Sequence, residues 1–224
     1  MKNLLFLTPE LPYPPQSGGK VKSLRLLDAL ADRYRVTLVS PLKASDAGHR
    51  PHFAARSRCH THLHRPVDVN RSARSLLASY LRGVPLNVHR SYDAALAAQV
   101  RRLAESQDLI VVDHYEMAPY VPQDFQGTVV YHAHNAYHQL WNRYARLPGN
   151  LLIRAAAHLE ARRVHRAETA LARRADLVFA APNDARFLAG AGVSEARIAH
   201  TYHLGDDSQL DLSPLSFDSS ALRL

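Results

Sequence analysis

Cysteine is nearly absent from this sequence, and long hydrophobic runs are absent altogether. Cys59 is the single cysteine among 224 residues, which excludes an internal disulfide framework and favours a reducing compartment. No apolar run approaches the roughly 18–20 residues that span a bilayer. The first residues also lack the basic and apolar regions of a secretory signal peptide. We therefore expect a cytoplasmic protein.

Three motifs of common nucleotide-dependent and hydrolytic enzymes are missing as well. Without Gly-x-Gly-x-x-Gly a nicotinamide cofactor is not expected, and without Gly-x-x-x-x-Gly-Lys-Ser/Thr the chain is not a P-loop enzyme. The absence of Gly-x-Ser-x-Gly argues against an α/β hydrolase. Cys59 has no local activating signature, and we interpret it as a small buried apolar residue. The sequence therefore predicts no cofactor.

Acidic residues are outnumbered, because 20 Asp and Glu stand against 28 Lys and Arg, a formal net charge of +8. This charge favours anionic partners, namely nucleic acid, phospholipid head groups or phosphorylated small molecules. Several arginines fall in a predicted helix at residues 151–174, where Glu160 and Glu168 are spaced to pair with them. The remaining basic face is interpreted as solvated. The helix lacks interleaved aromatic residues, which argues against nucleic-acid binding. Peripheral attachment at the inner face of a membrane fits the charge.

Short apolar runs alternate with helical patterns along most of the chain. Strands are predicted at residues 3–8, 35–40, 59–66, 109–112, 128–131, 177–180 and 198–202. Helices are predicted at 20–32, 69–81, 91–107 with Ser91 as N-cap, from 136 to a break at Pro148-Gly149, 151–174 and 183–191, whereas 41–58 is predicted to be a loop that has room for a short helical turn. This alternation predicts an α/β fold, a Rossmann-like parallel sheet with helices on both faces. We place one domain at residues 1–204 and an irregular tail at 205–224.

The first forty residues contain a strand, a proline-rich loop, a helix and a second strand. The loop ends in Ser17, Gly18 and Gly19, where the helix begins. Free backbone N–H groups and the positive end of the helix dipole point into such a loop. A helix start of this kind suits a phosphate group. We therefore predict a phosphate site at Ser17, Gly18 and Gly19.

Polar side chains follow two neighbouring predicted strands. Asp113 and His114 come after residues 109–112, and His132, His134 and Asn135 come after residues 128–131. In open α/β sheets, ligands bind beyond the carboxyl ends of the strands. His134 is placed to act as a general base or to hydrogen-bond a sugar hydroxyl, with Asp113 orienting it. The alternative interpretation is that these residues are structural caps on the following helices.

Three histidines alternate along the predicted strand at residues 59–66. His60, His62 and His64 share one face of that strand, and three imidazoles on one face are able to bind a metal. The alternative is a short edge strand with its polar side chains facing out. No Asp, Glu or Cys lies nearby on that face to complete a site, so we expect no metal.

Several segments resemble the family 4 glycosyltransferases of the GT-B fold. Residues 4–19 resemble the start of that family, and residues 23–40 resemble the helix and Val-Thr-Leu-Val strand that follow. Residues 159–163 and 173–178, with Glu168 between them, resemble the helix and strand that close its N-terminal domain. The family's His-Asn segment is matched by Tyr131-His132-Ala133-His134-Asn135. Together these segments cover most of the chain, in order.

The resemblance implies the acceptor-binding domain of an enzyme whose nucleotide-sugar donor lies between two Rossmann-like domains. On this basis Ser17, Gly18 and Gly19 approach the donor diphosphate. The resemblance also implies a transfer that retains the anomeric configuration without a protein nucleophile. The acceptor is expected to be a lipid-linked saccharide or a surface polysaccharide precursor. We assign catalytic roles to His134 and Asp113, and acceptor binding to His114, Asn135 and Lys20.

The chain also departs from the family pattern. It has His132 where the family often has an acidic residue, and Tyr137 where a Glu often follows the His-Asn pair. Residues 213–224 resemble the approach to the donor domain, whose motifs are not in the sequence. We therefore expect little transfer by this chain alone. We also expect the chain to be a truncated gene product, a fragment, or one subunit of a split enzyme whose donor domain is a separate chain. The alternative is a non-catalytic binding or scaffold protein on a Rossmann-like fold.

Overall fold

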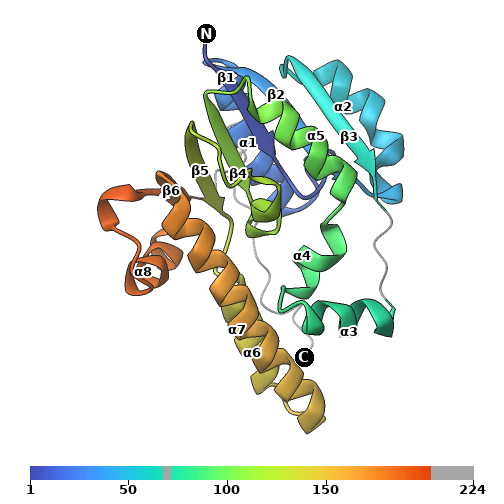
Figure 1. The fold of residues 1–224 in the computed structure, drawn as a ribbon, viewed down its shortest axis with the longest axis vertical. Helices are drawn as coiled ribbons and strands as arrows, with labels where there is room; N and C mark the ends of the chain where they lie inside the picture. The colour runs from blue at the N-terminus through green and yellow to red at the C-terminus, as the bar shows by residue number, and fades with distance from the viewer. Residues whose placement is uncertain (68–71, 203–224) are drawn as a thin grey trace, which may run out of the picture.

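A computed structural model describes residues 1–67 and 72–202, which contain a seven-stranded sheet of order β3-β2-β1-β4-β5-β6-β7 (Figure 1). Every neighbouring pair of strands is parallel. The strands are β1 (Asn3–Leu7), β2 (Arg35–Leu42), β3 (Thr61–Pro66), β4 (Leu109–Asp113), β5 (Thr128–Ala133), β6 (Leu177–Ala180) and β7 (Ile198–His200). This arrangement confirms the predicted α/β fold with a Rossmann-like parallel sheet.

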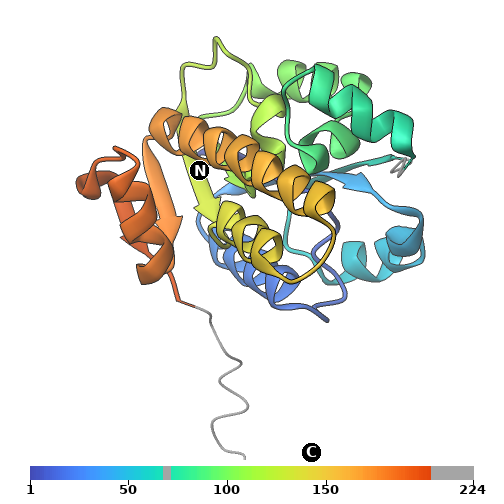
Figure 2. The same cartoon turned by 90° about the horizontal axis from the view of Figure 1, so that it is seen from below.

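Helices connect the strands and cover both faces of the sheet (Figures 1 and 2). The α-helices are α1 (Gly18–Ala31), α2 (Arg50–Arg56), α3 (Ala73–Leu81), α4 (Leu86–Ser91), α5 (Ala94–Ala104), α6 (Tyr137–Arg146), α7 (Leu151–Arg174) and α8 (Pro182–Gly190). Short 3-10 turns are η1 (Ala44–His49), η2 (Tyr115–Tyr120) and η3 (Glu195–Arg197). Within the described residues, no helix is long and apolar enough to cross a membrane.

Strand β1 lies at the centre of two hydrophobic cores. Side chains alternate along a strand, so Leu4 and Phe6 pack with Leu24 and Leu27 of α1 on one face. Leu5 and Leu7 belong to the core on the other face, which includes residues of α5, α7 and α8. The four apolar side chains of β1 are fully buried. A continuous apolar run is what a parallel strand covered on both faces requires.

The order of the strands creates a topological switch point beside β1. Its neighbours are β2 on one side and β4 on the other, with Leu7 paired to both Val39 and Val112. The connection after β1 leads to α1, while the chain after β4 enters η2. The two connections diverge at the carboxyl ends of the strands, which is where open α/β sheets bind ligands.

Two predicted elements differ in the structure. Residues 41–58 contain η1 and α2, more helix than the predicted loop with a short helical turn, and the buried ring of Phe53 docks α2 onto the core. The helix predicted at 91–107 begins later, as α5 at Ala94, and Ser91 is instead the last residue of α4, a helix that was not predicted. The N-cap of α5 is Asp93, whose Oδ1 accepts a hydrogen bond from the backbone N–H of Leu96 at 2.6 Å.

The two glutamates of α7 have more specific roles than surface pairing. Arg163 and Glu160 are buried, with Nη1 of the arginine 2.6 Å from Oε2 of the glutamate. Arg163 Nη2 also donates to the carbonyl oxygen of Ser79, which attaches α3 to α7. Glu168 accepts hydrogen bonds from the first backbone N–H groups of α6, Tyr137 among them. The prediction of a wholly solvated basic face is therefore wrong around Arg163.

Helices α6 and α7 form an antiparallel hairpin that extends beyond the carboxyl ends of the strands (Figure 1). The break predicted at Pro148-Gly149 is its turn. Helix α7 has the predicted bounds, and its N-cap Asn150 accepts a hydrogen bond from the N–H of Leu152 at 2.8 Å. The predicted tail at 205–224 lies outside the described residues.

Candidate active site

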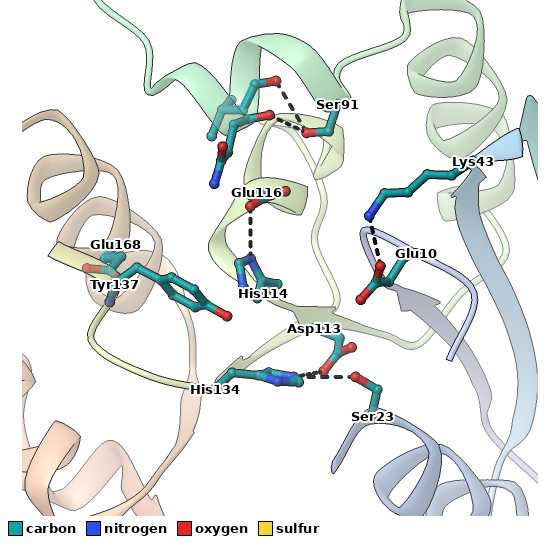
Figure 3. Close-up of polar contacts among 12 residues, drawn as sticks. Glu10, Ser23, Lys43, Ser91, Asp113, His114, Glu116, His134, Tyr137 and Glu168 are labelled. Atoms are coloured by element: carbon teal, nitrogen blue, oxygen red, sulfur yellow. Dashed lines mark hydrogen bonds and ion pairs between the residues drawn. The ribbon is translucent and has the colours of Figure 1, made fainter. Parts of the chain in front are cut away.

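A cleft of about 200 Å³ lies at the switch point, at the carboxyl ends of β1, β4 and β5 (Figure 3). Each neighbouring element contributes polar groups to it. The lining residues are Thr8, Pro9, Glu10, Gly19, Ser23, Lys43, Asp113, His114, Glu116, His134 and Tyr137. Sequence positions far apart in the chain thus converge because parallel strands end at the same edge of the sheet.

Asp113 is the buried centre of this cleft. Its Oδ1 lies 2.7 Å from Nδ1 of His132 and 2.6 Å from Nε2 of His134, and all three side chains are buried. Burial alone would raise the pKa of Asp113, but the charge of His134 and the two hydrogen bonds together hold it well below its ordinary value. Asp113 is therefore a carboxylate that accepts hydrogen bonds from both rings.

The contact with Asp113 fixes the orientation of the His134 ring. Since the carboxylate accepts, Nε2 of His134 carries a proton, and Nδ1 is the basic nitrogen of the neutral ring. Nδ1 faces Gly19 of α1, because a Cβ built on Gly19 would lie 3.7 Å from it. Ser23 Oγ lies 3.5 Å from Nε2. The predicted Asp113–His134 pair is thus brought together with a free nitrogen beside the glycine loop.

His114 has a strained backbone at the end of β4. Its φ of 99° and ψ of 138° lie in a region that residues with a side chain rarely adopt. Burial lowers the pKa of His114 to about 3, so its ring is neutral at physiological pH. The ring stacks on Tyr115 at 5.1 Å and meets Tyr137 edge-on at 4.3 Å between centroids. The strain places a neutral imidazole against the cleft.

Glu116 is a second acid–base group in the cleft. Its Oε1 lies 3.7 Å from Nδ1 of His114 (Figure 3). Burial raises the pKa of Glu116 to about 7, with Lys43 and a hydrogen bond from Asn87 acting in the opposite direction. A carboxyl group with a pKa near 7 is suited to proton transfer at physiological pH. Lys43 itself pairs with Glu10 at 2.8 Å.

The predicted phosphate loop lies next to this cleft. Ser17 is the N-cap of α1, and its Oγ accepts a hydrogen bond from the N–H of Lys20 at 3.3 Å. Gly18 and Gly19 are the first residues of the helix, and Gly19 lines the cleft. The positive end of the α1 dipole therefore lies at the cleft, as the sequence predicts.

Two predicted acceptor residues are not part of the cleft lining. Lys20 Nζ instead pairs with Asp46 of η1 at 3.0 Å, and Lys20 is not among the lining residues. Asn135 is exposed and lines a different, much smaller pocket together with His138 and Asp184. Of the three predicted acceptor residues, only His114 lines the cleft.

Sequence reasoning missed six charged or hydroxyl-bearing cleft residues, namely Thr8, Glu10, Ser23, Lys43, Glu116 and Tyr137. Glu10, Lys43 and Glu116 come from loops and turns, where periodicity gives no information about direction, whereas Tyr137 is the first residue of α6. Two of these residues could have been noticed in the sequence. Glu116 is an acidic residue between Tyr115 and Met117, shortly after a predicted buried strand, and Tyr137 stands where the family pattern often has a Glu.

The residues able to hold a metal differ from those considered in the sequence. His60 contacts Arg35, His62 Nε2 lies 3.1 Å from Ser57 Oγ, and His64 Nδ1 lies 2.8 Å from Ser40 Oγ. The rings of His62 and His64 are half-buried against Phe53 and do not face out. In the part of the chain that the structure describes, Asp113, His132 and His134 are the group whose ligand atoms lie within 4.8 Å of one another. Hydrogen bonds account for their contacts.

No protein-family description matches the chain, and no curated protein is significantly similar to it. Among solved structures, it is similar to the crystal structure of Arabidopsis thaliana UGT89C1 complexed with UDP. The sequence identity is 15% and the TM-score is 0.49. The similarity covers 92% of this chain and 50% of that chain, so this chain spans half the length of that structure.

Proposed function

We propose that this chain is the acceptor-binding part of a glycosyltransferase that uses a nucleotide-sugar donor. The observation that carries the proposal is the cleft at the switch point, where the Asp113–His134 pair faces the glycine start of α1. A base for a hydroxyl group and a helix start for a phosphate are thereby adjacent. The family 4 resemblance, and a role in surface polysaccharide or glycolipid synthesis, belong to this proposal.

The geometry gives each group a part in the transfer. The acceptor hydroxyl lies at Nδ1 of His134, which takes its proton as the new glycosidic bond forms. The bond between the anomeric carbon and the donor phosphate breaks, and the nucleoside diphosphate leaves with its charge near the start of α1. Asp113 holds the ring in the required tautomer and stabilises the positive charge that develops on it.

The anomeric outcome is a separate part of the proposal. The family resemblance implies retention, in which the leaving phosphate helps to deprotonate the acceptor. A protein base such as His134 is also what a direct displacement with inversion requires. The anomeric configuration of the product, measured by proton NMR after transfer with a donor-domain partner, distinguishes the two.

Binding measurements on the 224-residue chain test the proposal. We expect retention of the chain on an array of immobilised and lipid-linked saccharides, at least tenfold weaker for His134→Gln and unchanged for Asp124→Asn on the opposite edge of the sheet. Calorimetry with nucleotide-sugars should show weak binding or none. The proposal is wrong if no saccharide retains the wild-type chain. If His134→Gln is retained as well as the wild type, the non-catalytic binding protein is favoured instead. Micromolar binding of a nucleotide-sugar would contradict the proposal that this chain binds the acceptor and a separate part binds the donor.

A further inference from the structure

The exposed large apolar side chains of this protein are gathered in two segments. Apart from Met1, Phe187 and Tyr202, every such side chain in the described residues lies in α3–α4 with the following Tyr92, or in the α6–α7 hairpin. They are Leu76, Leu77, Leu81, Tyr92, Leu140, Tyr144, Leu147, Leu151, Leu152, Ile153 and Leu159. We refer to residues 72–92 and 137–159 together as the apolar end. Clustering of this kind marks an interaction surface.

The two segments of the apolar end are attached to each other. Tyr80 Oη donates to the carbonyl oxygen of Ala156 at 3.3 Å, and the guanidinium of Arg163 lies over the Tyr80 ring at 4.4 Å. Glu160 Oε1 accepts from the backbone N–H of Leu86 at 2.6 Å. Helix α3 is therefore fixed alongside α7, and both lie at the end of the molecule toward which the strands run (Figure 1).

The apolar end has a charge of one sign. Neither segment contains an Asp or a Glu, although the whole chain has 20 of them. The basic residues in the two segments are Arg74, Arg82, Arg90, Arg143, Arg146 and Arg154. Arg74, Arg82, Arg143 and Arg146 are exposed, and none pairs with an acidic side chain in the described residues.

We propose that the apolar end docks onto an anionic lipid surface, with the hairpin turn inserted at the interface. Leu151, Leu152 and Ile153 are 74%, 78% and 55% exposed at the turn. Apolar side chains enter the acyl boundary while the flanking arginines bind lipid phosphates. A symmetric contact with a second copy is disfavoured because it would bring two unpaired basic surfaces together.

Docking in this orientation has a consequence for the acceptor. The cleft lies at the carboxyl ends of the strands, and the hairpin extends beyond that same edge (Figures 1 and 3). A saccharide whose lipid stays in the bilayer is thus presented on the side where the cleft lies. This consequence, that the acceptor is lipid-linked, rests on the proposed function, whereas docking itself does not.

Co-flotation of the 224-residue chain with vesicles tests the docking. We expect the chain to float with vesicles of phosphatidylcholine containing 30% phosphatidylglycerol, at least tenfold more than with phosphatidylcholine alone, and less at 0.5 M salt. Leu151→Ser/Leu152→Ser and Arg143→Glu/Arg146→Glu should each lower flotation at least fivefold. Phe187→Ser and Arg102→Glu are matched controls outside the apolar end and should float like the wild type.

Two results would overturn the inference. One is equal recovery of the wild type with and without anionic lipid, and the other is unchanged flotation of both double variants. A stable dimer in light scattering that the leucine variant abolishes would assign the surface to a second copy instead. If the chain floats with anionic vesicles but no saccharide retains it, docking is supported and the proposed function is wrong. If saccharides retain the chain but it does not float, only the docking is wrong.

Discussion

Nε2 of His134 lies 2.6 Å from Oδ1 of Asp113, at the buried floor of the cleft. Asp113 is the last residue of β4 and His134 follows β5, and the two are brought together because β4 and β5 are neighbours in the sheet. The contact leaves Nδ1 as the basic nitrogen and directs it toward Gly19. A helix cap would satisfy a backbone N–H, but Asp113 Oδ1 instead accepts from two imidazoles, which favours the acid–base interpretation.

The first prediction concerns Asp113. Its pKa lies well below the ordinary value because the charge of His134 and the two hydrogen bonds outweigh burial. The carboxylate therefore stabilises the fold above its ordinary pKa of about 4, and this contribution is lost as the pH falls below that value. Asp113→Asn should lower the free energy of unfolding at pH 7 by about 3 kcal/mol, the typical cost of breaking a buried pair.

Urea denaturation at pH 7 and at pH 3.5 measures this effect. The difference between the wild type and Asp113→Asn should narrow at the lower pH. Asp124→Asn is the matched control, because Asp124 forms an exposed pair with Arg101, and exposed pairs contribute at most about 1 kcal/mol. An equal loss for Asp113→Asn at both pH values would contradict the low pKa.

The second prediction concerns Glu116, whose pKa is raised to about 7 by burial. Below about pH 4.5 the carboxyl is protonated in both the folded and the unfolded chain. Between pH 4.5 and 7 only the unfolded chain ionises, so the wild type loses stability relative to a neutral side chain as the pH rises. Glu116→Gln should therefore raise the free energy of unfolding by about 3.5 kcal/mol at pH 8, from about 1.4 kcal/mol for each unit of pKa over about 2.5 units.

The difference between Glu116→Gln and the wild type should disappear at pH 4, which denaturation at both pH values will show. Glu105→Gln, at an exposed position of the same chain, is expected to give the same small difference at both. A Glu116→Gln variant that is less stable than the wild type at pH 8 would show that the carboxylate is needed in its ionised form.

The third prediction concerns the strained backbone of His114. At a φ of 99° and a ψ of 138°, a side chain costs about 1–3 kcal/mol that glycine does not incur. His114→Gly should therefore be more stable than His114→Ala by about 1–2 kcal/mol, since both variants lose the same ring. Thermal or urea unfolding of the two variants measures the difference directly.

The order of glycine and alanine should be reversed at an ordinary position. Ala155 is exposed within α7, and Ala155→Gly should cost about 1 kcal/mol. If alanine were also the more stable residue at position 114, the backbone there would not be strained, and the placement of the imidazole would need another cause.

The sheet could be predicted from sequence because its strands are short apolar runs buried on both faces. Residues 109–112 need no partner to be recognised, since their pattern is local. The docking of α2 could not be predicted in this way. Phe53 stands alone in a polar stretch, and it is the single buried side chain of α2, where its ring contacts Tyr13 and the core.

The candidate site was predictable where it follows from topology and missed where it depends on side-chain direction. Asp113 and His134 follow strands whose carboxyl ends must meet at one edge. The sequence near Lys20 gives no sign of a partner for its ammonium group, which in the structure forms an ion pair with Asp46 of η1. Glu116 is largely enclosed because η2 follows the end of β4 directly, and no local pattern encodes that enclosure.

The last prediction separates two adjacent glycines. A methyl group at Gly19 would lie 3.7 Å from Nδ1 of His134, an ordinary van der Waals distance that the fold tolerates. At Gly18 the methyl group would meet nothing within 4 Å. Alanine is a better helix former than glycine by up to about 1 kcal/mol, so neither substitution should lower the free energy of unfolding.

Ligand binding should nevertheless distinguish the two variants. Gly19→Ala covers the nitrogen that the proposed mechanism uses and should lower retention on the saccharide array at least tenfold, whereas Gly18→Ala should bind like the wild type. Urea denaturation of both variants shows that the fold is intact. Equal binding by Gly19→Ala and Gly18→Ala would contradict the proposed mechanism. A methyl group beside Nδ1 of His134 would then leave ligand binding unchanged, so the ligand would not approach that nitrogen from the side of α1.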